Sequence, residues 1–182
     1  MARQLLFVQG AGAGAYDDWD SKLVSSLARK LGPIVEIRYP RMPDEADPRF
    51  SVWSSALTQE IDKLSEGAML VGHSIGGTVL IHHLARMPPK IELAGVFLIA
   101  APFIGNGGWP SDEISSTSDL GAKLPRIPIH LYQGDADDTV PPHHADLYAA
   151  AIPAAILHRL ERRDHQLNDD MSEVAADILA LL

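Results

Sequence analysis

A serine stands between two glycines in the stretch Gly72-His73-Ser74-Ile75-Gly76. An apolar run at residues 68–72 precedes it, and a helical pattern over residues 75–86 follows it. In this context the pattern G-x-S-x-G is typical of a sharp strand-to-helix turn that holds a nucleophilic serine above a sheet. Side chains at the two glycine positions would collide with neighbouring backbone. The stretch therefore predicts Ser74 as a nucleophile.

A serine hydroxyl becomes a good nucleophile only beside a base that a carboxylate orients. In this type of fold the acid and then the histidine follow the serine along the chain, each on a loop after a strand. The apolar segment 127–132 runs into QGDADDTVPP, and the segment 155–160 runs into ERRDHQLND, where His165 is the candidate base. The candidate acids are Asp135, Asp137 and Asp138. The spacing thus predicts nucleophilic catalysis by serine, aspartate and histidine.

Short apolar segments alternate with helical patterns along the chain and would position these residues. The expected strands are residues 4–8, 34–39, 68–72, 95–100, 127–132 and 155–160. Their apolar, weakly alternating composition indicates a parallel sheet covered on both faces. Three helices are expected over residues 50–64, 75–86 and 144–151. Two more are expected from their apolar faces. The first has Trp19, Leu23, Leu27 and Leu31 on a buried stripe, and the last has Met171, Val174, Ala175, Ile178 and Leu182 on one face. This order predicts the α/β class: a three-layer α/β/α sandwich with a doubly wound, mostly parallel sheet of about six strands.

The chain resembles the α/β-hydrolase superfamily, and more narrowly the small, nearly lidless serine hydrolases similar to retinoblastoma-binding protein 9. The resemblance rests on the opening glycine-rich loop, VGHSIGG, GDADDTVPP and the late Asp-His, and it extends over essentially the whole chain. The superfamily's acid loop commonly follows G-x-x-D-x-x-V-P, which implies Asp137 as the acid. Many relatives begin the first loop with His-Gly, whereas this chain has Gln9-Gly10.

The resemblance also implies acyl transfer, in which a covalent acyl group forms on Ser74 and water releases it. The oxyanion hole would be formed by the backbone N–H of Ile75 and one N–H of the first loop, with Ala11 favoured over Gly12. The implied reaction is hydrolysis of small carboxylic esters, thioesters or amides. The alternative is a protein-interaction module that keeps the hydrolase fold with little or no turnover.

The glycine-rich loop itself permits a different hypothesis. Gly10, Gly12 and Ala15 fit the loose dinucleotide pattern G-x-G-x-x-G/A. That pattern also needs an acidic residue at the end of the second strand, but Glu36 lies in its middle. No G-K-[ST] follows the glycines, which excludes a P-loop. We expect no cofactor, and an oxyanion rather than a phosphate at this loop.

Side chains on loops near the serine could line the substrate pocket, and the candidates are Tyr16, Phe103, Trp109 and Val140. Residues 103–123 are polar and aperiodic, so they predict a loop or minimal cap. No metal site is expected: the adjacent His82 and His83 do not face one point on a helix, and His158 within a strand is expected to be structural.

The bulk composition narrows the possible partners. With 182 residues, 46% hydrophobic and 21% charged, the chain is expected to form one domain over residues 1–182. A net charge of −9 with no basic cluster argues against nucleic acid as a partner. The absence of cysteine removes thiol nucleophiles and disulfides. The apolar run near the N-terminus is too short for a signal peptide or a membrane span, so a cytoplasmic protein acting on a small molecule is expected.

Overall fold

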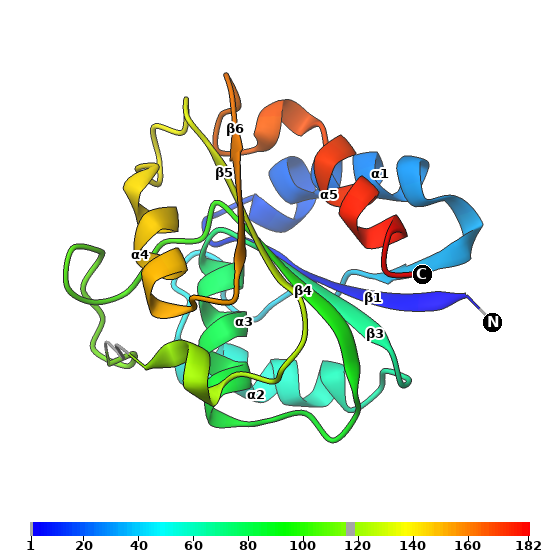
Figure 1. Cartoon of the computed structure of the whole chain (residues 1–182), viewed down its shortest axis with the longest axis horizontal. Coiled ribbons are helices and arrows are strands. Elements are labelled where there is room, and N and C mark those ends of the chain that lie inside the picture. Colours follow the sequence, from blue (N-terminus) through cyan, green and yellow to red (C-terminus); the bar gives the residue numbers. More distant parts are fainter. Residues whose placement is uncertain (1, 116–118) are drawn as a thin grey trace.

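The computed structural model describes residues 2–115 and 119–182 and has a six-stranded parallel sheet at its centre (Figure 1). The strands follow the order β2-β1-β3-β4-β5-β6 across the sheet. Their bounds are Arg3–Val8 (β1), Val35–Arg38 (β2), Ala68–His73 (β3), Leu93–Ile99 (β4), Ile129–Gly134 (β5) and Ile156–Leu160 (β6). All six expected strands are present with shifted ends, and the predicted fold class is confirmed.

Helices cover both faces of the sheet, as the apolar strands require. One face carries α1 (Asp20–Leu31) and α5 (Ser172–Leu179), and the other carries α2 (Phe50–Ile61), α3 (Ile75–Arg86) and α4 (His143–Ala151) (Figure 1). Every residue of β3 and of β5 is buried. Two separate hydrophobic clusters, one on each face, hold the three layers together.

The parallel pairing places the loops of interest at one edge. In the register between β1 and β3, Val8 lies opposite Gly72, so the glycine-rich loop and the serine turn start side by side. The ends of β5 and β6 are likewise in register, with Gly134 opposite Leu160. The carboxyl ends of β1, β3, β5 and β6 therefore deliver their loops to the same edge of the sheet.

The first helix begins differently from its expected pattern. A π-helical turn, Ala15–Trp19, precedes α1, and Trp19 is 49% exposed. Leu23, Leu27 and Leu31 are buried, so the predicted stripe starts one turn later than expected. The wider turn changes the angular spacing between residues, which rotates Trp19 away from the stripe.

The described part of the segment 103–123 contains little regular structure, and several of its side chains are buried. Phe103, Ile104, Ile114 and Leu120 are buried in the cluster beneath it, and Leu120–Lys123 forms a short 3-10 helix. Residues 116–118 of this segment lie outside the described part of the chain. The described part of the segment thus packs closely against the α/β body.

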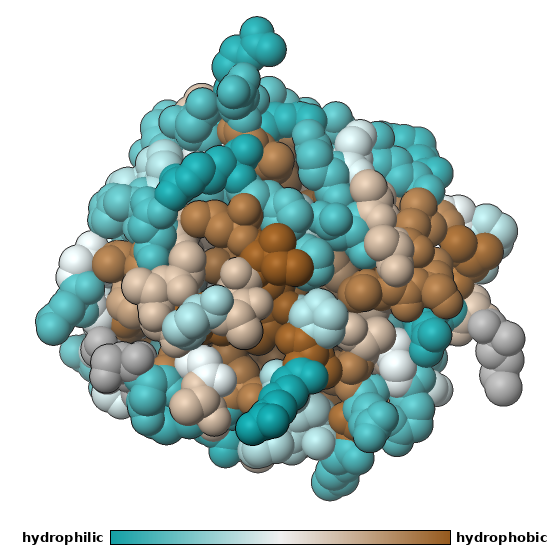
Figure 2. All heavy atoms as spheres, in the orientation of Figure 1, coloured by the Kyte–Doolittle hydropathy of each residue, from teal (hydrophilic) through white to brown (hydrophobic). Residues whose placement is uncertain are grey.

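On the face shown in Figure 2, hydrophilic side chains surround extended apolar areas. On the face shown, one apolar area lies over α5 and the C-terminal end, where Leu179 and Leu182 are exposed. In residues 2–115 and 119–182 there is no helix with the length and apolar character that crossing a membrane requires.

Candidate active site

Ser74 occupies a strained turn between β3 and α3. Its backbone has φ 50° and ψ −130°, a conformation that L-residues adopt rarely. A Cβ at Gly76 would lie 2.0 Å from the backbone O of Gln9, and one at Gly72 would lie 2.5 Å from the Cα of Gly77. Only glycine fits at these two positions, and their absent side chains let β1, β3 and α3 approach closely around Ser74.

A continuous chain of polar contacts joins Ser74 to a histidine and an aspartate. The Nε2 atom of His165 lies 3.0 Å from Ser74 Oγ, and its Nδ1 lies 2.9 Å from Asp137 Oδ2. His165 comes from the loop after β6 and Asp137 from the loop after β5. The structure thus brings together all three predicted residues in hydrogen-bonding order.

The carboxylate of Asp137 is held by its own loop and by the end of β5. Its Oδ1 accepts the backbone N–H groups of Thr139 (2.9 Å) and Val140 (2.8 Å), and its Oδ2 accepts Gln133 Nε2 at 2.9 Å. Burial alone would raise the pKa of Asp137, but the hydrogen bonds from His165, Val140 and Gln133 outweigh burial and lower it. A charged acceptor is therefore fixed against His165.

The two neighbouring aspartates point elsewhere. Asp135 Oδ1 accepts the backbone N–H of Arg162 at 2.6 Å and so ties the β5 loop to the loop after β6. Asp138 is exposed, and its carboxylate lies 3.5 Å from the hydroxyl of Thr139. Of the three candidate acids, only Asp137 contacts His165 in the described structure.

The glycine-rich loop is already filled by carboxylates of the protein itself. The carboxylate of Glu45 accepts the N–H groups of Gly14 (3.1 Å) and Tyr16 (3.0 Å), and its backbone O accepts that of Gly12 at 2.6 Å. Gln9, where many relatives have histidine, donates to Glu45 at 2.6 Å. Burial by itself would raise the pKa of Glu45, but these hydrogen bonds lower it. The loop is therefore not an open phosphate cradle.

The backbone N–H of Ala11 lacks the contacts that occupy the N–H groups of its two neighbours in the loop. Gly10 N–H donates to Asp20 Oδ2 at 2.6 Å and Gly12 N–H to Glu45, whereas Ala11 N–H has no acceptor among the described residues. Ala11 and Ile75 both line the cavity next to Ser74. The two predicted oxyanion donors are thus on the same cavity wall.

A buried histidine and a buried aspartate lie close together next to the serine turn. His73 Nδ1 is 2.9 Å from Asp20 Oδ1, and His73 Nε2 is 3.0 Å from the backbone O of His165. Burial alone would lower the pKa of His73, but the charge of Asp20, followed by its hydrogen bond, raises it. The sequence favours local packing for His73, the variable residue of its motif, and does not single out Asp20.

A cavity of about 450 Å³ opens at Ser74 and is walled by both apolar and polar side chains. The indoles of Trp19 and Trp109 line it, together with Thr139 and Gln166. Trp109 is the one predicted pocket residue among its walls. Trp19 was expected in the core, and only the π-helical turn, which no sequence pattern indicated, turns it toward the cavity.

The other three predicted pocket residues lie outside the cavity walls. Tyr16 stacks on Tyr39 with ring centroids 4.3 Å apart, and its hydroxyl donates to the backbone O of Tyr39. Phe103 packs edge-on against Tyr148 in the core. Val140 is fully buried beneath the acid loop, where it donates its N–H to Asp137. These side chains support the loops instead of facing the cavity.

The fold and this arrangement of residues define the class of protein. A parallel sheet with a serine at the turn after a central strand, and with aspartate and histidine on later loops, is the α/β-hydrolase arrangement. The sequence profile of the family described as "Serine hydrolase" matches residues 5–171. The chain belongs to the serine hydrolase family, and the predicted superfamily and enzyme class are confirmed.

Solved structures share this fold at low sequence identity. The ydeN gene product of Bacillus subtilis is 18% identical with a TM-score of 0.77, and the match covers 99% of this chain and 98% of that chain. The meta-cleavage product hydrolase CumD of Pseudomonas fluorescens IP01 is 15% identical with a TM-score of 0.78, covering 99% and 90%. XC6422 of Xanthomonas campestris, described as an a/b serine hydrolase without lid, is 16% identical with a TM-score of 0.67, covering 100% and 82%. No curated protein matches the chain in sequence.

Proposed function

We propose that the protein hydrolyses small carboxylic esters through a covalent acyl group on Ser74. The observation that carries this proposal is the continuous chain from Ser74 Oγ through His165 to Asp137, with separations of 3.0 and 2.9 Å. These are hydrogen-bonding distances for a nucleophile, its base and the group that orients the base.

We assign one residue or group to each step of this reaction. His165 Nε2 takes the proton of Ser74 Oγ as that oxygen bonds to the carbonyl carbon. The N–H groups of Ala11 and Ile75 donate to the oxyanion, and each such donor contributes about 3 kcal/mol to the transition state. The tetrahedral intermediate then expels the alcohol, which takes its proton from His165. Water, deprotonated by His165, then attacks the acyl carbon. The bond between that carbon and Ser74 Oγ breaks, the carboxylic acid leaves, and Oγ takes back its proton from His165.

The cavity favours compact acyl groups with an apolar or aromatic part. Its volume of about 450 Å³ lies at the small end of ligand pockets. Trp19 and Trp109 offer aromatic surface beside Ser74, and among the described lining residues there is no lysine or arginine that would recognise a carboxylate. A neutral acyl group of modest length is therefore the proposed substrate class.

The test is a series of p-nitrophenyl esters of rising acyl length, assayed with the wild-type protein and with Ser74→Ala. We expect kcat/KM to be highest for short chains, and Ser74→Ala to lower it by at least about 10³-fold. Negligible turnover across the series by folded wild-type protein would contradict the proposal and favour the interaction-module alternative. Equal activity of wild type and Ser74→Ala would contradict it as well.

A further inference from the structure

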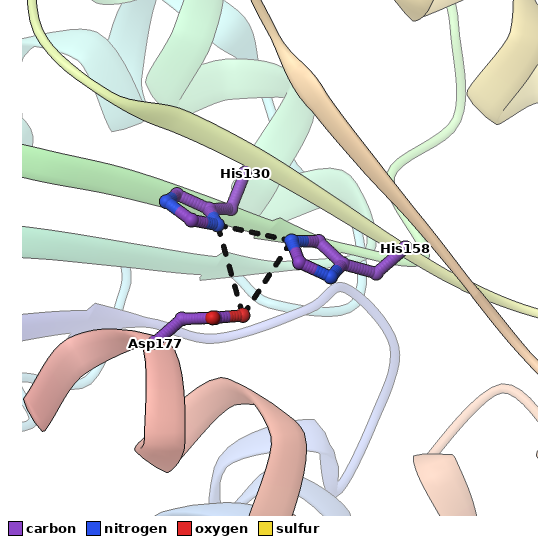
Figure 3. Close-up of side chains that lie close together, drawn as sticks. All are labelled: His130, His158 and Asp177. Atoms are coloured by element: carbon purple, nitrogen blue, oxygen red, sulfur yellow. Dashed lines mark hydrogen bonds and ion pairs between the residues drawn. The ribbon is translucent and has the colours of Figure 1, made fainter. Parts of the chain in front are cut away.

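Three side chains from three elements meet on the α5 side of the sheet, away from Ser74. His130 of β5, His158 of β6 and Asp177 of α5 point toward one another (Figure 3). The Nδ1 of His130 lies 3.0 Å from Nε2 of His158, and these atoms lie 3.7 and 3.5 Å from Asp177 Oδ2. Two imidazole nitrogens and a carboxylate oxygen thus form a compact triangle.

The dimensions of this triangle match a bound transition-metal ion. Ligand atoms at about 2.0–2.1 Å from a tetrahedral zinc ion lie about 3.3–3.4 Å from one another. The three observed separations, 3.0, 3.5 and 3.7 Å, bracket that value. A cation at the centre would replace the contact between the two imidazole nitrogens, and a water could complete its coordination.

The surroundings of the triangle also suit a cation. The hydroxyl of Tyr132 donates to Asp177 Oδ2 at 2.7 Å and so orients the carboxylate, as outer partners of metal ligands do. Within residues 2–115 and 119–182, no lysine or arginine forms an ion pair with Asp177. The side chains of His158 and Asp177 are 25% and 31% exposed, so a solvated ion can reach them.

We propose that His130, His158 and Asp177 form a binding site for a late first-row divalent cation, with Zn²⁺ as the representative ion. Each imidazole uses the nitrogen that faces the triangle, and the proton of the N–H···N contact moves to an outer ring nitrogen. This site was missed in the sequence because its members are far apart and belong to two strands and a helix.

The site would also join both ends of one segment of the chain. His158 precedes His165, and Asp177 follows it on α5. A shared cation would therefore connect the edge strand β6 to α5 around the loop that carries His165. A cation that binds the folded state but not the unfolded state raises the free energy of unfolding, and this gain grows with the logarithm of the cation concentration divided by Kd.

The test is calorimetric titration of Zn²⁺ into protein freed of metal by a chelator, with melting curves in parallel. We expect one equivalent to bind, and Tm to rise with Zn²⁺ and fall with excess EDTA. The variants are His158→Gln and Asp177→Asn, of which the second keeps the size of the side chain. His143→Gln, which alters an exposed histidine on α4, is the matched control.

Each variant should weaken Zn²⁺ binding at least about tenfold while the control binds as wild type does. Circular dichroism checks that the variants are folded before titration. The proposal is overturned if folded wild type takes up no Zn²⁺ at millimolar concentration. It is equally overturned if both variants bind Zn²⁺ as tightly as wild type does.

A separate observation concerns Asp20 and His73, and it rests on the function proposed above. The His73 ring lies between two acceptor groups, with Nδ1 2.9 Å from the Asp20 carboxylate and Nε2 3.0 Å from the His165 backbone O. The other oxygen of Asp20 accepts Gly10 N–H. We infer that Asp20 is a positioning residue that holds the first loop, through Gly10, and the His165 loop, through His73, at fixed places around Ser74.

The test is steady-state kinetics of Asp20→Asn on the best ester, with Asp17→Asn as the control for an exposed carboxylate of the same segment. We expect Asp20→Asn to lower kcat at least about tenfold with little change in KM, because small displacements of catalytic groups are costly. Its pH profile should also shift, since a nearby charge is removed. Asp17→Asn should match wild type.

The two ways of failing are distinguishable. If wild type is active and Asp20→Asn has the same kcat and pH profile, the positioning role is wrong while the proposed function stands. If wild type itself hydrolyses no ester and reacts with no serine-directed probe, the proposed function fails first, and the role of Asp20 fails with it.

Discussion

At Asp137, the charge and the direction of the carboxylate decide its proposed role. Two backbone N–H groups and Gln133 fix it, and His165 Nδ1 lies 2.9 Å away. The neutral asparagine would leave His165 without a charged partner and would favour the wrong tautomer of its ring. The Asp137→Asn substitution would conserve only the size of the side chain.

We therefore expect Asp137→Asn to lower kcat by about 10⁴-fold. Asp135→Asn and Asp138→Asn, which alter carboxylates that do not contact His165, should retain nearly all activity. Stopped assays of the three variants on one ester provide the comparison. A larger loss in Asp135→Asn or Asp138→Asn than in Asp137→Asn would contradict the assignment of the acid.

The residues of this site differ in how far the sequence could predict them. Ser74 and His165 follow from short patterns and from chain order, and Asp137 follows from the resemblance of its loop to a known pattern. The roles of Glu45 and Asp20 were not predicted, because their contacts to the glycine-rich loop depend on where loops separated by many residues meet. Side chains on loops have no periodicity that would reveal such contacts.

At the scale of elements, the crossing of β1, β3 and α3 depends on glycine. Replacing Gly76 by alanine would place a Cβ 2.0 Å from the backbone O of Gln9. Relieving this clash would require the backbone to move, which costs much free energy. Gly32 provides a contrast, because a Cβ added there would meet no atom within 4 Å and only its φ of 62° disfavours alanine.

Gly76→Ala should therefore lower the free energy of unfolding by about 3 kcal/mol or more, or prevent folding altogether. Gly32→Ala should cost about 1–3 kcal/mol, the penalty for a side chain at φ 62° and ψ −159°, a region that essentially only glycine adopts. Urea unfolding followed by circular dichroism measures both. If Gly76→Ala were as stable as Gly32→Ala, the close packing at the serine turn would be refuted.

Elements were predicted better than their ends and local irregularities. The six strands and the buried stripes of the helices follow from apolar runs and periodicity, which depend on burial alone. The π-helical turn before α1 lies where the loop contacts Glu45, which is distant in the sequence, so the orientation of Trp19 could not be predicted from the spacing of leucines. The meeting of β5, β6 and α5 at the His130 triangle likewise depends on tertiary packing.

For the whole molecule, buried neutral histidines should govern stability in acid. His82 on α3 is buried, and burial, aided by Arg86, lowers its pKa to about 4. A histidine whose folded pKa is depressed binds more protons when unfolded, so it destabilises the fold progressively as pH falls from about 6.5 toward 4. The lowered pKa of Asp137 acts in the same direction at lower pH.

We expect the free energy of unfolding to drop by about 2–3 kcal/mol from His82 alone between pH 7.5 and 4.5. In His82→Gln this part of the decrease in the free energy of unfolding at low pH should disappear. The dependence of that free energy on pH above 7.5 should stay unchanged. Urea unfolding of both proteins at the two pH values gives the difference. Identical pH dependence in the two proteins would mean that His82 titrates normally in the folded state.

The central claim is that Ser74 is a nucleophile activated by His165, and covalent labelling tests it most directly. The folded protein is incubated with a fluorophosphonate and analysed by intact and peptide mass spectrometry. We predict one adduct per chain on Ser74, no adduct in Ser74→Ala, and greatly slowed labelling in His165→Ala. Absence of an adduct on folded wild-type protein, or an adduct on a residue other than Ser74, would contradict the account.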